Sequence, residues 1–137
     1  MIAIRPWEPR DRVAVEALMK QLSDDAVVVG DDAPVYVAVA EERVVGMVTL
    51  CVFRTLTGTK AFLDHLVVAP EWRRRGIGRA LVEHAIAVAE AAGASRIDLT
   101  AGDGKDAGRA LYRSLGFTER DTTSFRLDLV RRGLRVP

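Results

Sequence analysis

The chain has 137 residues, 49% of them hydrophobic, and its 20 Lys and Arg against 19 Asp and Glu leave a formal net charge of +1. This length and composition predict one domain with a hydrophobic core and argue against disorder. The near-zero charge gives no general support for binding nucleic acid or a membrane surface, so any anion site must be local.

The single cysteine, Cys51, excludes an internal disulfide and favours a reducing compartment. Its apolar neighbours predict a buried side chain rather than a nucleophile. The first ten residues lack the apolar stretch of a signal peptide, and no apolar run is long enough to span a bilayer. We therefore expect a cytoplasmic protein.

The first half of the chain is expected to place strands around one helix. The expected strands are residues 2–7, two strands within 35–53 that meet at a turn at 41–43, and residues 61–69. A helix is expected over residues 11–22, where apolar residues recur at the spacing of one buried face. Residues 23–34 have no firm period. Their four aspartates hint at a cationic acceptor, but an exposed acidic loop is the simpler explanation.

The second half is expected to begin with a long helix from Gly76 to a stop at Gly93. Then come a strand over residues 95–101, a helix over 107–115 closed by Gly116, and one or two closing strands over 117–130. The basic tail 130–137 is expected to fray.

This element order predicts an α/β (α+β) fold in a single domain over residues 1–137. A single mixed, largely antiparallel sheet flanked by helices fits it best. The strand–helix–strand segment over residues 61–101 should be the parallel, right-handed crossover.

Residues 73–79 lie between the end of a strand and the start of the long helix. A helix N-terminus has unpaired N–H groups and a partial positive charge, so phosphates bind there readily. Gly76 and Gly78 lack a Cβ, which lets an anion approach the backbone closely. Arginines around that point add donors and charge. They are Arg73, Arg74, Arg75 and Arg79.

Other motifs fit poorly. The Gly-Ile-Gly of this segment lacks the third glycine of a dinucleotide fingerprint, and neither a P-loop nor a Gly-x-Ser-x-Gly elbow is present. Two histidines and one cysteine, well separated, make no zinc site, so we expect no metal.

The pattern Arg/Gln-x-x-Gly-x-Gly/Ala is present as Arg73 to Gly78 within LVVAPEWRRRGIGRALV, and AGRALYRSLGF follows downstream. Together these segments resemble the GNAT superfamily of N-acetyltransferases, most specifically from Phe62 to Phe117, and they look like its small single-domain bacterial members. The resemblance implies a GNAT-like fold and transfer of an acetyl group from acetyl-CoA to a primary amine of a small molecule, peptide or protein. The competing interpretation is a non-catalytic acyl-CoA-binding regulatory module. A homodimer is compatible with either.

The resemblance also implies roles for individual residues. The backbone of Leu66, Val67 and Val68 would hold the pantetheine arm. The pyrophosphate would take the amides of the loop from Arg74 to Arg79, which includes Ile77. Lys105 stands where many members carry an asparagine, so another contact must replace that residue or Lys105 itself reaches the cofactor.

Tyr112 corresponds to a family tyrosine near the thioester sulfur. Attack on the thioester expels a thiolate, to which a phenol can donate a proton, although the ring could instead simply pack. We expect direct transfer without an acyl-enzyme, because the only thiol is assigned to the core.

Asp64 and His65 are the candidate proton acceptors, since the amine arrives mostly as ammonium near pH 7. Strand alternation predicts that their side chains leave opposite faces of the sheet. An acidic residue often assists on this strand in the family, so Asp64 is the first choice, and His65 has the better intrinsic pKa. A salt bridge or hydrogen bond to a neighbouring strand is the structural alternative.

Overall fold

The computed structural model describes residues 1–23, 30–101 and 106–129. The expectations for residues 24–29, for Lys105 and for the tail 130–137 lie outside these described residues. The elements are β1 (Ala3–Pro6), α1 (Arg12–Met19), β2 (Val35–Ala40), β3 (Arg43–Thr55), β4 (Gly58–Val68), α2 (Ile77–Ala91), β5 (Ile97–Asp98) and α3 (Asp106–Ser114). Short 3₁₀ turns precede α1 at Pro9–Asp11 and follow β4 at Pro70–Trp72.

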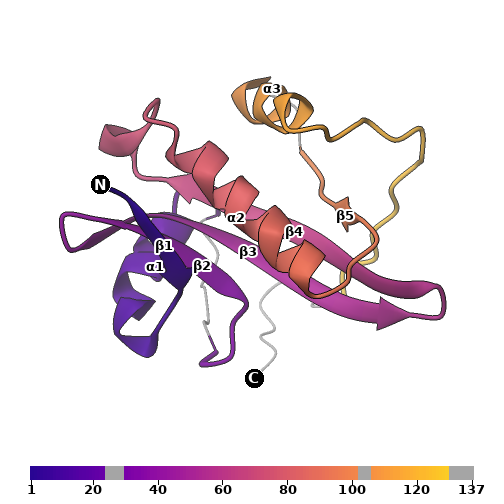
Figure 1. Cartoon of the computed structure of the whole chain (residues 1–137), viewed down its shortest axis with the longest axis horizontal. Coiled ribbons are helices and arrows are strands. Elements are labelled where there is room, and N and C mark those ends of the chain that lie inside the picture. The colour runs from indigo at the N-terminus through magenta and orange to yellow at the C-terminus, as the bar shows by residue number, and fades with distance from the viewer. Residues whose placement is uncertain (24–29, 102–105, 130–137) are drawn as a thin grey trace.

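The described residues form one five-stranded sheet in the order β1-β2-β3-β4-β5 (Figure 1). The first three pairings are antiparallel, and β4 pairs with β5 in parallel. Since α2 connects β4 to β5, the predicted mixed, largely antiparallel sheet and its parallel strand–helix–strand unit are both confirmed.

The two faces of the sheet carry separate cores because side chains alternate along β2 and β3. One face packs against α2, whose Ile77, Leu81 and Ala85 are buried as the sequence pattern predicted. The other face packs against α1 through Val15 and Leu18. Each fully buried aliphatic side chain of this size contributes about 1.5–3 kcal/mol by leaving water.

The hairpin between β2 and β3 turns at the predicted place. Glu41 and Glu42 have φ values of 50° and 63°. Positive φ at both central residues is what a type I′ turn requires, and this turn matches the right-handed twist of the flanking strands.

The predicted closing strands over residues 117–130 are wrong for the described part of that range. No strand is assigned between Phe117 and Leu129, where the chain runs as an extended trace after α3 (Figure 1). Phe125, Leu127 and Leu129 alternate as in a strand, yet they are 91%, 82% and 86% exposed. A strand needs a partner edge, and β5 extends over only Ile97–Asp98, so the local pattern finds no ladder to join.

One prediction of side-chain environment is also wrong. Cys51 is exposed, because it lies in the part of the β3–β4 hairpin that leads to the turn, here called the hairpin arm, where the last five residues of β3 are all exposed. His84 on α2 is half-buried, with its ring centroid 5.1 Å from that of Tyr36. Among the described residues, no helix is both long and apolar enough to cross a membrane.

Candidate active site

A β-bulge in β4 shapes the first part of the site. Met47 pairs with Val67 and Thr49 pairs with Asp64, so Val48 alone stands opposite two residues of β4. One of those two is His65, whose φ of 50° is uncommon for a residue other than glycine. Such a bulge interrupts the alternation of side chains and redirects those beside it.

The predicted placement of Asp64 and His65 on opposite faces is therefore wrong. The Asp64 carboxylate accepts a hydrogen bond from the His65 backbone N–H at 2.8 Å, and its other oxygen lies 3.5 Å from His65 Nε2. The two side chains remain 53% and 40% exposed. They form one acid–imidazole pair that solvent and a substrate can reach.

Thr49 on β3 completes this cluster. Its hydroxyl Oγ1 lies 3.0 Å from the Asp64 carbonyl oxygen and 3.2 Å from His65 Nδ1. The predicted alternative of a hydrogen bond to a neighbouring strand is thus also present. Sequence reasoning missed Thr49 because its contact with His65 depends on the bulge, which no local signal in β3 or β4 announces.

The start of α2 supplies the second part of the site. The Ala80 N–H donates to the Gly76 carbonyl at 3.0 Å, so the N–H groups of Ile77, Gly78 and Arg79 precede the helical ladder. Within the described chain no side chain caps them. Gly76 has a φ of 79°, and no described atom lies within 4 Å of where its Cβ would be. Open space therefore borders these donors, as an anion site requires.

The end of β4, the start of α2 and the helix α3, to which the sequence analysis assigned the site, meet at Gly78. A Cβ built there would lie 3.8 Å from Val68 on β4 and 3.7 Å from Leu111 on α3. Arg79 Nη1 also donates to Ser114 Oγ at 3.0 Å, which joins the first turn of α2 to the end of α3. The end of β4, the start of α2 and α3 thus lie together.

The edge of β4 is open beside this junction. Its pairing with β5 is recorded only at Ala61 and Phe62, so among the described strands none pairs with that edge over residues 63–68. The backbone of Leu66, Val67 and Val68 belongs to this unpaired stretch. One of its acceptors is used locally, because the Val68 carbonyl accepts a hydrogen bond from Arg73 Nε at 3.1 Å.

The arginines around the glycines have different surroundings. Arg73 also donates to the Gln21 side chain at 2.6 Å, and the Arg75 guanidinium lies 4.6 Å from the centre of the Trp72 ring. For Arg74 the described structure gives no side-chain partner; it is exposed and has a φ of 62°. Arg74 is therefore the guanidinium best able to turn toward a bound anion.

Tyr112 on α3 is half-buried, and its ring meets Phe117 edge-on at 5.7 Å between centroids. Burial, and then the negative charge of Asp64, raise the pKa of the Tyr112 hydroxyl above its ordinary value. The phenol therefore stays protonated at neutral pH and can act as a proton donor.

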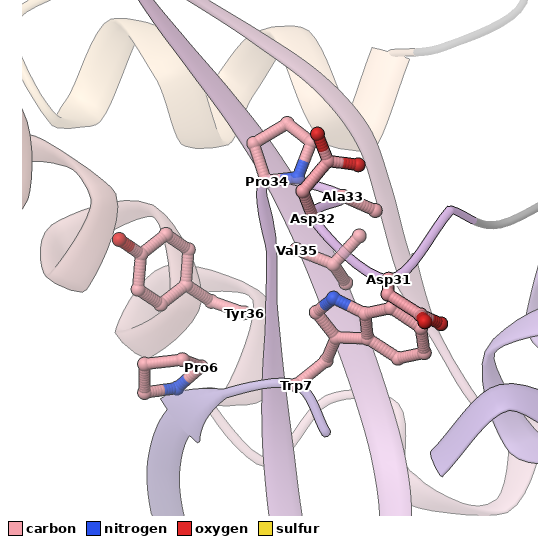
Figure 2. Close-up of a pocket in the computed structure, with 8 residues that line it drawn as sticks. All are labelled: Pro6, Trp7, Asp31, Asp32, Ala33, Pro34, Val35 and Tyr36. Carbon is pink, nitrogen blue, oxygen red and sulfur yellow. The ribbon is translucent and has the colours of Figure 1, made fainter. Parts of the chain in front are cut away.

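A surface pocket lies where the chain enters β2 (Figure 2). Its lining residues are Pro6, Trp7, Asp31, Asp32, Ala33, Pro34, Val35 and Tyr36. Trp7 and Asp31 lie to one side of the strand and Tyr36 to the other (Figure 2). Arg12 forms an ion pair with Asp31 and lies 5.2 Å from the centre of the Trp7 ring. Since this pairing balances one of the aspartates, the pocket does not by itself indicate a cationic acceptor.

Over residues 1–23, 30–101 and 106–129, no group of three or more His, Cys, Asp or Glu side chains is placed to hold a metal ion.

Comparison with known proteins identifies the class of protein that this fold and site define. The family model described as the acetyltransferase (GNAT) family matches residues 2–117. The chain therefore belongs to the GNAT acetyltransferase family.

Two curated relatives show how this chain compares in sequence. It is 38% identical over 92 residues to human N-acetyltransferase 8, an alignment that covers 66% of this chain and 40% of that protein. It is 30% identical over 86 residues to the PanD regulatory factor of Escherichia coli K12, covering 63% of this chain and 65% of that protein. The aligned part is thus less than two thirds of the length of each relative.

A solved structure shares the fold. The ribosomal-protein-alanine N-acetyltransferase from Brucella melitensis biovar Abortus 2308 superposes with a TM-score of 0.77 at 23% identity, over 94% of this chain and 99% of that one. At this level of identity the likeness concerns the fold alone.

Proposed function

We propose that this protein transfers the acetyl group of acetyl-CoA directly to a primary amine of a small molecule, peptide or protein. One observation carries the proposal. In a chain of the GNAT family, a single junction brings together the Asp64–His65 pair, the uncapped start of α2 and a phenol that stays protonated. These are a proton acceptor, an anion site and a proton donor.

Acetyl-CoA fits the junction in two places. The pyrophosphate would take the free N–H groups of residues 77–79, beside the open space at Gly76, and Arg74 would add charge. The pantetheine arm would lie along the unpaired edge of β4 at Leu66 to Val68. An extended ligand can use the backbone groups of such an edge as another strand would.

Side chains are then available for two proton transfers, one from the incoming amine and one to the departing thiolate. The Asp64–His65 pair would take a proton from the incoming ammonium, which frees the nitrogen lone pair for attack on the thioester carbon. The new C–N bond forms as the C–S bond breaks, and the nitrogen releases its second proton to solvent to give the neutral amide. Tyr112 would give its proton to the departing thiolate and regain one from solvent.

Direct transfer is retained although Cys51 is exposed. The acid–imidazole pair and Tyr112 together provide for the protons of a one-step transfer, so no acyl-enzyme is needed. Cys51 pairs with Phe62 on the hairpin arm. We further propose an intracellular, reducing location, which a single exposed thiol fits.

A non-catalytic acyl-CoA-binding module is the second candidate. One observation favours it, since a relative that aligns over 63% of this chain is named a regulatory factor rather than a transferase. In that case the start of α2 would bind the nucleotide and the acid–imidazole pair would have no acceptor to deprotonate.

The experiment that separates the two candidates measures transfer itself. The full chain is incubated with acetyl-CoA and a panel of amines, including an N-terminal alanine peptide, lysine, a polyamine and an aminoglycoside. Mass spectrometry then follows acetylated product, because a thiol-reactive dye would also report exposed Cys51. Amine-dependent product supports the enzyme. Stabilisation by acetyl-CoA without product for any amine supports the regulatory module.

A further inference from the structure

We infer that Thr49 fixes the tautomer of His65, with the proton on Nδ1, and so makes Nε2 the atom that accepts the proton of the acceptor amine. The catalytic role of Nε2 in this inference rests on the proposed acetyl transfer. The tautomer of His65 rests on the hydrogen bonds alone. Thr49 thereby becomes a positioning residue of the site.

The assignment follows from counting protons around one hydroxyl group. A threonine hydroxyl has a single proton, and a backbone carbonyl can only accept. Thr49 Oγ1 lies 3.0 Å from the Asp64 carbonyl oxygen, so its proton belongs on that contact. The reverse arrangement would leave two oxygens facing each other at 3.0 Å with no proton between them.

The donor and the acceptor of the second contact are then fixed. With its proton directed at the Asp64 carbonyl, Oγ1 can only accept from His65 Nδ1, 3.2 Å away. A neutral imidazole has one N–H, so the proton lies on Nδ1 and Nε2 keeps a lone pair. A free imidazole side chain prefers the opposite tautomer, with the proton on Nε2.

The surroundings of Nε2 suit a proton acceptor. The Asp64 carboxylate lies 3.5 Å from Nε2 and would stabilise the imidazolium after it takes a proton. Tyr112 on α3 lies within electrostatic range of Asp64, and its raised pKa keeps it neutral at neutral pH. His65 is 40% exposed, so an amine can reach the ring.

Thr49 is more deeply buried than the ring it orients. It is 8% exposed, within β3, while His65 occupies the bulge at a φ of 50°. A non-glycine residue keeps such a conformation only when its surroundings compensate the cost. Here the Asp64 carboxylate binds the His65 N–H, and Thr49 binds both the Asp64 carbonyl and the ring.

Imidazole ¹⁵N NMR tests the tautomer without any substrate. The chain has only two histidines, so His84→Gln leaves His65 as the single imidazole signal. In that background, at a pH above the imidazole pKa, we expect protonated Nδ1. Thr49→Ser should keep this tautomer, and Thr49→Val should shift the population toward protonated Nε2. A wild-type ring protonated on Nε2, or a Thr49→Val ring unchanged from wild type, overturns the inference.

The pH–rate profile tests the catalytic half with an acceptor that the wild type acetylates. Thr49→Val should lower kcat/KM about tenfold at neutral pH, which is less than the roughly 10²–10⁴-fold that the positioned base itself contributes, and Thr49→Ser should stay near wild type. A changed tautomer with an unchanged profile would show that Nε2 is not the acceptor. If wild type acetylates no amine, the proposed function fails, while the NMR result still decides the tautomer.

Discussion

Asp64 on β4 and Tyr112 on α3 lie within electrostatic range of each other, and the Asp64 charge adds to burial in raising the pKa of the Tyr112 hydroxyl. Two residues that are 48 positions apart in the sequence thus share one site. If Asp64 assists proton removal from the amine as proposed, the same carboxylate also favours the protonated form of Tyr112.

Replacement of Tyr112 by phenylalanine should lower kcat about 10²-fold while the KM for acetyl-CoA stays near wild type. The ring and its edge-on contact with Phe117 survive, but the proton for the thiolate is gone. Because the pKa of Tyr112 is raised, wild-type activity should persist to pH values above 10 before the phenol ionises. Steady-state rates across pH check both points. A wild-type kcat in the variant would leave Tyr112 a packing residue.

Gly76→Glu should abolish the thermal stabilisation that acetyl-CoA gives the wild type. A ligand at 100 times its Kd stabilises the folded state by about 2.7 kcal/mol, and a carboxylate in the open space before α2 would repel the pyrophosphate. Gly93→Glu is the matched control. Gly93 also has positive φ, 81°, and no described atom near its Cβ position, but it lies at the other end of α2. Equal ligand shifts in both variants would move the anion site elsewhere.

Asp64→Asn and His65→Gln should separate the roles within the pair. If Nε2 accepts the proton, His65→Gln should flatten the rise of kcat/KM with pH. Asp64→Asn should lower the rate mainly near neutral pH, since it removes the charge that stabilises the imidazolium. Profiles measured with one good acceptor decide the assignment. A profile changed only by Asp64→Asn would make the carboxylate the base, and two unchanged profiles would leave the proton to solvent.

Cys51→Ala should retain at least half of the wild-type kcat, because the thiol takes no part in a direct transfer. The same thiol should react readily with iodoacetamide in the folded protein, since it is exposed. Intact-mass measurement after a brief incubation with acetyl-CoA supplies the second readout. A stable acetyl group on Cys51, together with an inactive Cys51→Ala variant, would contradict direct transfer.

Asp11→Asn should destabilise the fold by about 2 kcal/mol at pH 7, the scale of hydrogen bonds to a charged group. Asp11 is 6% exposed and accepts hydrogen bonds from Arg5 at 2.7 and 3.1 Å and from the Glu8 N–H at 2.7 Å. The Arg5 hydrogen bond, which outweighs the opposing effect of burial, holds the pKa of Asp11 below its ordinary value near 3.8.

The sign of the pH dependence follows from that lowered pKa. The stabilisation from Asp11 is complete above pH 3.8, the ordinary value, and is lost as pH falls through the lower pKa of the folded state. Urea unfolding of wild type and Asp11→Asn should therefore give midpoints that converge in acid. A constant gap from pH 7 to pH 2 would contradict the role given to this carboxylate.

Features of the fold that depend only on residues close together in the sequence were predictable from it. The buried stripe of α2, the turn at Glu41 and Glu42, and the positive φ of Gly76 before α2 belong to this kind. They follow from side-chain spacing, turn geometry and the missing Cβ of glycine, which need no knowledge of distant contacts. The anion site itself stays a prediction.

What the sequence did not reveal depends on pairing between distant segments. Strand alternation placed Asp64 and His65 on opposite faces, because the bulge exists only where β4 meets β3. Cys51 has the neighbours of a buried residue, but the last five residues of β3, which begin with Cys51, are all exposed. Phe125 and Leu127 follow a strand pattern without a described partner edge. In each case a tertiary contact, or its absence, overrides the local pattern.

The additional residue in β4 confines its effect to the bulge itself. Asp64 pairs with Thr49 before the bulge and Val67 pairs with Met47 after it. Deletion of His65 would therefore restore regular pairing and leave buried Val67 opposite Met47. Gene libraries built on this chain should show that a single-codon deletion of residue 65 still yields folded protein, while acetyl transfer is lost if the imidazole is the base.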